Sequence, residues 1–292
     1  MLQHPRISVI IPFHNNKETF RRCLDSVTAQ TYGDYDIICV DDASDDDTAS
    51  IIRSEYPEVT VLTNETVQGP LRSRLRGVKH SDAEYILFVD ADDYIDSDFV
   101  EKIMAQSNLN TVVMGSVKNE NNEGEAISIN DDLIAMHGDE VMDGFFSQAG
   151  SDLRWFTLWG NLIPRFVIID DAREMDSFAY IPIGEDIPSM AQILHNVESV
   201  VSTQDSFYHY VKNMNGLTHK VMNYDDMLKA IAGLKEIFSY LKKIEKNSET
   251  QRCGYEAWKS DYLKIWSKKI RIMEKNPLKK VLLLMRLQSA LK

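Results

Sequence analysis

The sequence predicts an α/β fold, in which a mostly parallel sheet carries helices on both faces and a helical region follows it. Two observations predict this fold. The first hundred residues alternate short apolar runs with segments whose apolar residues recur at helical spacing, a pattern typical of a parallel sheet with crossover helices. From Tyr224 onward the pattern is helical. We therefore expect a sheet domain over residues 1–220, with halves at 1–117 and 118–220, and a helical region over 221–292.

The expected strands and helices follow one another regularly along the first half. The apolar, β-rich runs predict strands at residues 7–11, 37–40, 59–62 and 85–89. The first run stops at Pro12. Helices are expected from Phe20 to Val27, Ile51 to Tyr56, Leu71 to Val78 and Phe99 to Met104. Asp47, and either Asp96 or Ser97, are the expected N-terminal caps.

The second half is less regular. Residues 118–132 are polar and rich in Asn and Glu, which indicates a surface loop. Residues 207–211 alternate as a short strand.

Composition excludes several classes of protein. The 292 residues are 43% hydrophobic and 26% charged, as in ordinary globular proteins. The net charge of −13 argues against a nucleic-acid partner, because such binding uses clustered Lys and Arg. No stretch approaches the roughly 20 apolar residues of a membrane span, and no apolar signal region precedes the first strand. We expect a cytoplasmic protein whose cysteines, Cys23, Cys39 and Cys253, are reduced packing residues.

The charge is distributed unevenly. Residues 259–292 contain ten Lys or Arg and two acids, whereas the preceding residues contain 22 basic and 43 acidic side chains. The apolar residues at the start of this tail are spaced as one helical face: Trp258, Tyr262, Ile265, Trp266, Ile270 and Met273. Such a helix can lie on an anionic membrane surface, or it can pack on the rest of the protein. The sequence leaves both open.

Polar side chains follow each of the four expected strands. In order along the chain they are His14 and Asn15; Asp41, Asp42 and Ser44; Thr63 and Asn64; and Asp90, Asp92 and Asp93. Open parallel sheets bind ligands beyond the carboxyl ends of their strands. We therefore expect these side chains to share one acidic pocket.

The carboxylates after the fourth strand indicate a metal site. Asp90, Ala91 and Asp92 come directly after the apolar run 86–89. Clustered carboxylates repel one another, and a divalent cation relieves that repulsion. Oxygen ligands favour Mg²⁺ or Mn²⁺ over zinc. The alternative is a solvated acidic turn and helix cap, because Asp is common in both.

Taken in order, these motifs resemble those of family 2 glycosyltransferases, whose catalytic domain has the GT-A fold. The resemblance is carried by residues 8–15, 30–32, 40–44, Gly69 with Arg74, and 84–94, with weaker similarity at 159–165, 184–186 and 207–210 before Thr218. It implies an inverting transfer of a sugar from a UDP-sugar to a hydroxyl of a glycan acceptor, assisted by Mn²⁺ or Mg²⁺. It also suggests a bacterial enzyme that extends a lipid-linked surface polysaccharide at the inner face of the cell membrane.

On the donor side, the resemblance implies that Pro12, His14 and Asn15 line the nucleotide site and that Asp42 accepts a hydrogen bond from the base. It places Arg74 near the diphosphate, with Arg72 as the alternative.

The resemblance also divides the roles within the acidic motif. It implies that Asp92 is the direct metal ligand. Asp90, beside Ala91, then contacts the ribose or supports the metal.

On the acceptor side, a base must take the proton of the attacking hydroxyl. The resemblance implies that this base is Asp186, with Glu185 in reserve. The alternative is that Asp186 caps the helix that begins near Pro188. Trp159 and Asn161 are similar to the family's acceptor motif, where an aromatic face can stack on a sugar, although a Trp in an apolar run equally fits the core.

Two other functions remain open. A non-catalytic subunit of the same fold that binds nucleotide-sugar or glycan has no need of the second carboxylate, Asp186. A nucleotidyltransferase would be expected to have a glycine-rich phosphate loop with a basic residue after the first strand, and residues 12–16 do not form one.

Overall fold

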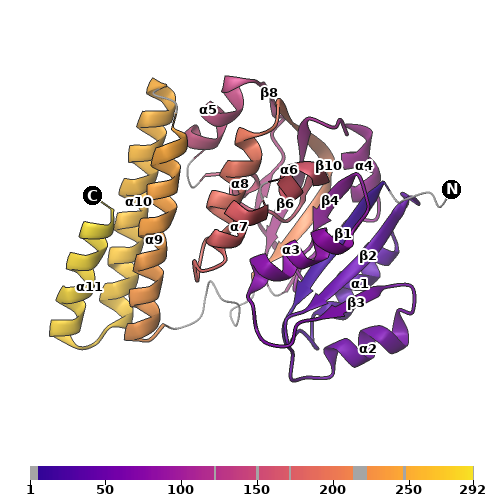
Figure 1. Cartoon of the computed structure of the whole chain (residues 1–292), viewed down its shortest axis with the longest axis horizontal. Helices are drawn as coiled ribbons and strands as arrows, with labels where there is room; N and C mark the ends of the chain where they lie inside the picture. Colours follow the sequence, from indigo (N-terminus) through magenta and orange to yellow (C-terminus); the bar gives the residue numbers. More distant parts are fainter. Residues whose placement is uncertain are drawn as a thin grey trace.

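A computed structural model of the chain describes residues 6–121, 123–148, 151–170, 172–212, 222–245 and 248–291. Figure 1 shows an α/β part that contains the sheet and, beside it, three long helices, α9 (Tyr224–Ile244), α10 (Glu249–Met273) and α11 (Pro277–Ala290). This arrangement confirms the predicted fold class.

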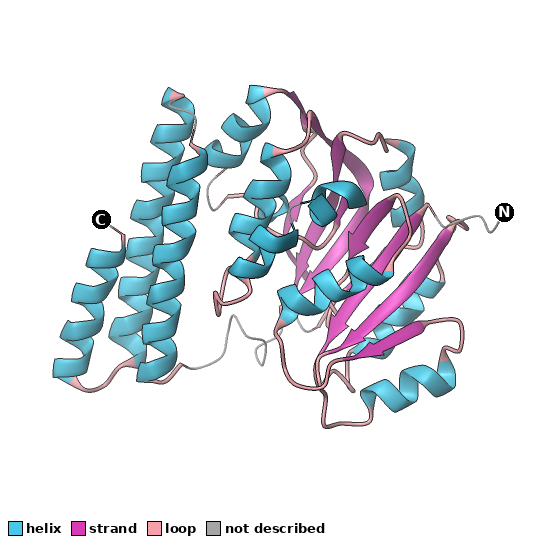
Figure 2. Cartoon of the chain, in the orientation of Figure 1, coloured by secondary structure: helices cyan, strands magenta, loops and turns pink. Residues whose placement is uncertain are grey.

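One twisted sheet forms the centre of the α/β part, as Figure 2 shows. Along the sheet the strand order is β3-β2-β1-β4-β9-β6-β10-β5. The strands are β1 (Ile7–Phe13), β2 (Tyr35–Asp41), β3 (Thr60–Thr63), β4 (Tyr85–Phe88), β5 (Tyr94–Ile95), β6 (Thr111–Glu120), β9 (Asn161–Pro164) and β10 (Ser199–Val211). β1 pairs in parallel with both β2 and β4, and β2 pairs in parallel with β3. β6 and β10 also pair in parallel. β9 is antiparallel to both β4 and β6 and joins the two halves of the sheet.

The first four helices lie where the sequence predicts them. They are α1 (Phe20–Thr28), α2 (Thr48–Glu55), α3 (Pro70–His80) and α4 (Phe99–Ala105). Their caps differ from the prediction. Asp47 occupies the N-cap position of α2, but its carboxylate binds Lys17 Nζ at 2.8 Å. Asp98, not Asp96 or Ser97, precedes α4.

The prediction that β1 ends at Pro12 is wrong, because the strand continues to Phe13. β4 pairs with β1 only as far as Ile10, whereas β2 pairs with it along its whole length. Pro12 therefore lies where the strand has a neighbour on one side only, and a missing N–H is tolerated there.

The prediction of a surface loop over residues 118–132 is also wrong. β6 runs on to Glu120 and forms an antiparallel hairpin with β7 (Ala126–Asn130). Side chains along β7 are exposed or half-buried, so this strand covers no core. Its alternation of Ile127 and Ile129 with polar residues is too short to stand out in a polar segment.

Shorter elements complete the second half of the α/β part. They are β8 (Ala135–His137), α5 (Asp139–Ser147), a 3₁₀ turn at Leu153–Trp155, α6 (Arg165–Asp170), α7 (Ala172–Phe178) and α8 (Asp186–His195). β6 runs through the expected division at residue 117, and the expected boundary at residue 220 lies outside the described residues. Among the described residues, no helix is long and apolar enough to cross a membrane.

Of the three long helices, α10 packs on the α/β part through the expected aromatic face. Trp258, Trp266 and Ile270 are buried, and the Trp258 ring lies 5.3 Å from that of Phe145 on α5. Of the two alternatives that the sequence left open for this face, the structure shows packing on the rest of the protein. Ile265 is an exception, because its side chain is exposed.

The cysteines are free. Cys23 and Cys39 are buried in the core, and Cys253 is exposed on α10.

Candidate active site

Asp42 follows β2 and forms hydrogen bonds to residues at the ends of β1 and β3. The carboxylate is buried after β2. It accepts hydrogen bonds at 2.8 Å from the Asn64 side chain, which follows β3, and from the backbone N–H groups of Gln68 and Gly69. The backbone N–H of Asp42 donates to the Phe13 carbonyl at the end of β1. Asp42 therefore shapes the loop that enters α3.

His14 and Asn15 meet the loop after β2. The His14 Nδ1 atom lies 2.9 Å from the Asp42 carbonyl. Asn15 has a φ of 57°; its N–H donates to Ser44 Oγ, and its side-chain oxygen accepts from the Asp45 N–H, both at 3.0 Å. The structure thus brings together the polar residues after β1 and β2, and Pro12 lies at the same edge of the sheet.

The turn after β4 is braced by Tyr208 on β10. The Tyr208 hydroxyl donates to Asp93 Oδ2 at 2.7 Å and accepts from the Asp90 N–H at 3.1 Å. Val211 N–H donates to the other oxygen of Asp93 at 2.8 Å. Burial, and then repulsion from Asp92 and Asp90, raise the pKa of Asp93 well above its usual value. This braced turn differs from the solvated acidic turn that the sequence left as an alternative.

Arg74 connects Asp90 at the end of β4 to Asp186, the expected base. Its guanidinium is buried; Nη2 lies 2.6 Å from Asp90 Oδ1 and Nη1 lies 3.1 Å from Asp186 Oδ1. Burial opposes the charge of Arg74, but Asp186 and Asp90 outweigh it and hold the pKa of the guanidinium above its usual value. Arg72, the alternative, instead binds Asp176 at 3.0 Å.

The carboxylates of Asp186 and Glu185 lie side by side where α8 begins. Burial raises the pKa of Asp186, and the Arg74 guanidinium and the Leu158 N–H oppose this rise. Burial and the neighbouring Asp186 raise the pKa of Glu185 to about 7. No side chain caps α8, so Asp186 does not have the capping role that the sequence left open.

Trp159 and Asn161 are mainly internal. Trp159 is buried and stacks on Tyr208 and Tyr210, at ring-centroid distances of 4.5 and 5.2 Å. The Asn161 amide is buried and donates to the carbonyls of Arg154 and Thr157. Both side chains are engaged in contacts within the protein. A direct contact of either residue with an acceptor stays a prediction.

Asp90 and Asp92 offer oxygen ligands for a divalent cation. Both are partly exposed at the end of β4, and Ala91 between them is buried. Among the described residues, no group of three or more His, Cys, Asp or Glu side chains could hold a metal alone. Mg²⁺ is commonly bound by one or two carboxylates together with substrate phosphates. The two carboxylates fit that mode of binding, in which the donor supplies further ligands.

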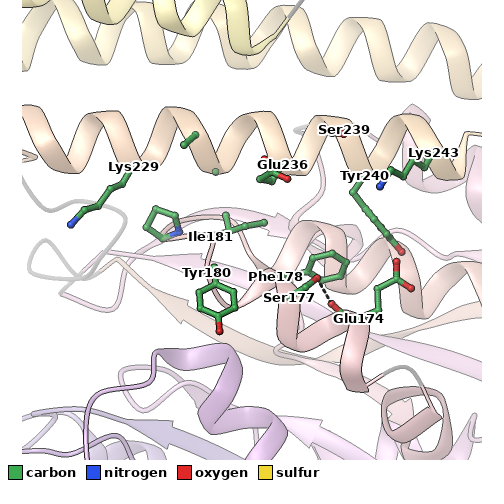
Figure 3. A pocket seen from close by; sticks show the side chains of 13 residues that line it. Glu174, Ser177, Phe178, Tyr180, Ile181, Lys229, Glu236, Ser239, Tyr240 and Lys243 are labelled. Carbon is green, nitrogen blue, oxygen red and sulfur yellow. Dashed lines mark hydrogen bonds between the residues drawn. The ribbon is translucent and has the colours of Figure 1, made fainter.

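A groove adjoins the loop that leads to Asp186. It has a volume of about 420 Å³ and lies between α9 and the segment 174–182. Its charged and aromatic lining comprises Glu174, Phe178, Tyr180, Lys229, Glu236, Tyr240 and Lys243 (Figure 3). The Tyr180 ring lies 4.3 Å from the guanidinium of Arg72 on α3. The groove therefore starts a few residues from the expected base along the chain.

Sequence reasoning missed Tyr208 and this groove. Tyr208 lies in the segment 207–210 that resembles the family, but its contact with Asp90 spans 118 positions. The expected contribution of Thr218 lies outside the described residues.

Comparison with known proteins agrees with this geometry. The model of glycosyl transferase family 2 matches residues 8–155. A poly(ribitol-phosphate) β-glucosyltransferase of Bacillus spizizenii is 38% identical over 128 residues, which cover 41% of this chain and 20% of that protein. WfgD of Escherichia coli, a UDP-Glc:α-D-GlcNAc-diphosphoundecaprenol β-1,3-glucosyltransferase, is 31% identical over 88 residues, 30% of this chain and 35% of that protein.

The fold is shared with a solved structure. The structure of S. aureus TarS 1–349 in complex with UDP-GlcNAc superposes with a TM-score of 0.76 at 16% identity, over 98% of this chain and 82% of that one. The family model matches just over half of the chain. This chain belongs to glycosyl transferase family 2.

Proposed function

We propose that this family 2 glycosyltransferase transfers a sugar from a UDP-sugar to a hydroxyl of a glycan acceptor, with inversion at the anomeric carbon. The observation that carries the proposal is the bridge of Arg74 between Asp90, on the donor side, and Asp186. TarS has been solved with UDP and with UDP-GlcNAc, which supports a UDP-sugar as donor.

The donor site is formed by the ends of β1, β2 and β4. Pro12, His14 and Asn15 line the nucleotide, and Asp42 faces the base. The position of His14 and Asn15 against the loop after β2 supports these roles. Asp42 already accepts three hydrogen bonds from the protein, so a base N–H would use the one lone-pair site that remains of about four.

Asp92 and Asp90 hold a divalent cation, Mn²⁺ or Mg²⁺, together with the donor diphosphate. Following the family resemblance, Asp92 is the direct ligand, and Asp90, which binds Arg74, supports the site. Such an ion supplies positive charge that offsets the charge on the leaving nucleoside diphosphate. Ala91 is small enough for the donor to approach the backbone between the two carboxylates.

Asp186 takes the proton of the attacking hydroxyl. The acceptor oxygen forms a bond to the anomeric carbon, the bond from that carbon to the diphosphate breaks, and its electron pair leaves with UDP. Arg74 supports this role because its charge opposes the rise in the pKa of Asp186. Glu185, whose pKa is raised to about 7, is the reserve base.

The acceptor extends from Asp186 into the groove beside α9. Tyr180 offers an exposed aromatic ring, and the carboxylates and lysines of the lining can bond sugar hydroxyls. Trp159 and Asn161 support the acceptor side as buried residues that pack within the protein. WfgD acts on a diphosphoundecaprenol-linked acceptor, which supports a lipid-linked glycan at the inner face of the cell membrane as the acceptor here. Within the α/β part, the first half then serves the donor and the second half the acceptor.

A panel of UDP-sugars tests the proposal without an acceptor. We expect one donor to bind and to be hydrolysed slowly, with stimulation by Mn²⁺. If the folded protein neither binds nor hydrolyses any donor, with or without metal, the proposal fails. Metal-independent binding of a donor, with hydrolysis absent for every donor, would instead favour the binding-subunit alternative.

A further inference from the structure

The outermost helix carries apolar residues on two opposite sides. α11 lies at the edge of the molecule away from the sheet (Figure 1) and packs against α9 and α10. On its inner side, Leu283 and Leu287 are fully buried. The side chains that form its outer stripe are Leu278, Val281, Leu282 and Met285, which are 82, 55, 47 and 63% exposed.

The outer stripe is a continuous surface feature. Its four residues recur at positions i, i+3, i+4 and i+7, the spacing of one face of a helix. Single exposed apolar residues are normal on protein surfaces, but a helix that is apolar on both sides is normally covered on both sides. The outer stripe therefore indicates a surface that docks on α11.

The charge around the stripe favours an anionic occupant. Lys275, Lys279 and Arg286 are exposed on or next to α11, and no Asp or Glu follows Glu274. A second copy that docked through the same stripe about a two-fold axis would bring these cations face to face. An anionic lipid surface attracts them instead.

We infer that the outer stripe of α11 docks the protein on the surface of an anionic lipid bilayer. α11 has 14 residues, fewer than the roughly 20 that cross a bilayer, so the helix lies in the headgroup region with its apolar side chains inserted. This surface differs from the aromatic face of α10, which is already packed on the protein. The inference deepens the proposed function and rests on it, because a docked enzyme would meet a lipid-linked acceptor.

Flotation of the full chain with phosphatidylcholine vesicles, with and without phosphatidylglycerol, measures this docking. We expect binding only when phosphatidylglycerol is present. Leu282→Glu combined with Met285→Glu should weaken the binding about tenfold or more, because two apolar side chains no longer insert. Lys275→Ser combined with Arg286→Ser should weaken it roughly thirtyfold, since each cation near such a surface contributes about 1 kcal/mol.

Two matched variants serve as controls. Ile127→Glu changes an exposed apolar residue on β7, and Lys102→Ser removes an exposed cation on α4. Both should bind like the wild type, and all variants should keep the wild-type Tm. Absent flotation, equal flotation with and without phosphatidylglycerol, or equal losses in stripe and control variants would overturn the inference. So would a lipid-independent dimer in sedimentation velocity that the stripe variants dissociate.

Donor hydrolysis separates this inference from the proposed function. Measured without lipid, hydrolysis of the UDP-sugar should be the same in the wild type and in the α11 variants, because α11 contains none of the proposed donor or base residues. A protein that hydrolyses donor but does not float keeps the proposed function and loses the inference. A protein that floats but has no donor activity keeps the docking surface and loses the proposed function.

Discussion

Replacing Arg74 with methionine removes the cation between Asp90 and Asp186 and leaves a flexible apolar chain in its place. The Arg74 side chain is 4% exposed, and those of Asp90 and Asp186 are 26 and 18% exposed. Removal of one partner from a buried ion pair costs about 3–5 kcal/mol. Because both carboxylates keep some access to water, we expect the free energy of unfolding to fall by about 3 kcal/mol near neutral pH. This loss corresponds to a Tm lower by roughly 6 °C.

The loss should depend on pH in a defined direction. Arg74 opposes the rise in the pKa of Asp186, so in the variant this pKa rises further above that of the unfolded chain. A carboxyl whose folded pKa is raised contributes stability below its unfolded pKa and loses it as the pH rises through the folded pKa. The deficit of Arg74→Met should therefore shrink in acid and grow toward neutral pH. The acid limb of the transfer rate should move to higher pH for the same reason.

Urea unfolding over a pH series measures this effect, with Arg72→Met as the matched control. The Arg72 pair with Asp176 is 24 and 49% exposed, and pairs of this kind contribute about 0–1 kcal/mol. A deficit of Arg74→Met that does not exceed that of Arg72→Met, or that stays constant with pH, would refute the bridging role of Arg74.

Three further predictions concern the surroundings of this bridge. Tyr208→Phe removes the hydroxyl that braces the turn after β4 and should lower the free energy of unfolding by about 2 kcal/mol and weaken donor binding; wild-type values in both assays would contradict the bracing role. A chelator should weaken donor binding to the wild type and have little effect on Asp92→Asn in calorimetry, whereas an equal effect on both would rule out Asp92 as the ligand. Tyr180→Ala should raise the KM for the acceptor roughly tenfold and leave donor hydrolysis unchanged; an unchanged KM or a loss of hydrolysis would contradict a role of Tyr180 in acceptor binding.

Sequence reasoning predicted well which polar residues share one edge of the sheet, because each strand there is a continuous apolar run that ends in polar residues. His14, Asp42 and Asp90 could be assigned to the same edge of the sheet from this pattern alone. The same pattern fails for β7, a short strand that covers no core and has only two alternating isoleucines, Ile127 and Ile129, within a polar segment.

Contacts between distant segments could not be predicted. Arg72 and Arg74 lie two positions apart on one helix, and only the packing of α8 and α7 shows that Arg74 reaches Asp186 while Arg72 reaches Asp176. The same limit applies to α11. Its inner and outer sides are both apolar, so the sequence alone does not distinguish Leu283, which is buried, from Leu282, which is exposed.

The central claim is that the donor is bound at Asp92 and that Asp186 acts as the base. Comparing Asp92→Asn with Asp186→Asn tests it most directly, with UDP-sugar binding measured by calorimetry in the presence of Mn²⁺ and transfer measured on the same preparations. We predict that Asp92→Asn weakens metal-dependent donor binding, whereas Asp186→Asn binds donor nearly normally and no longer transfers the sugar. An equal loss of donor binding in both variants, or normal transfer by Asp186→Asn, would contradict the account.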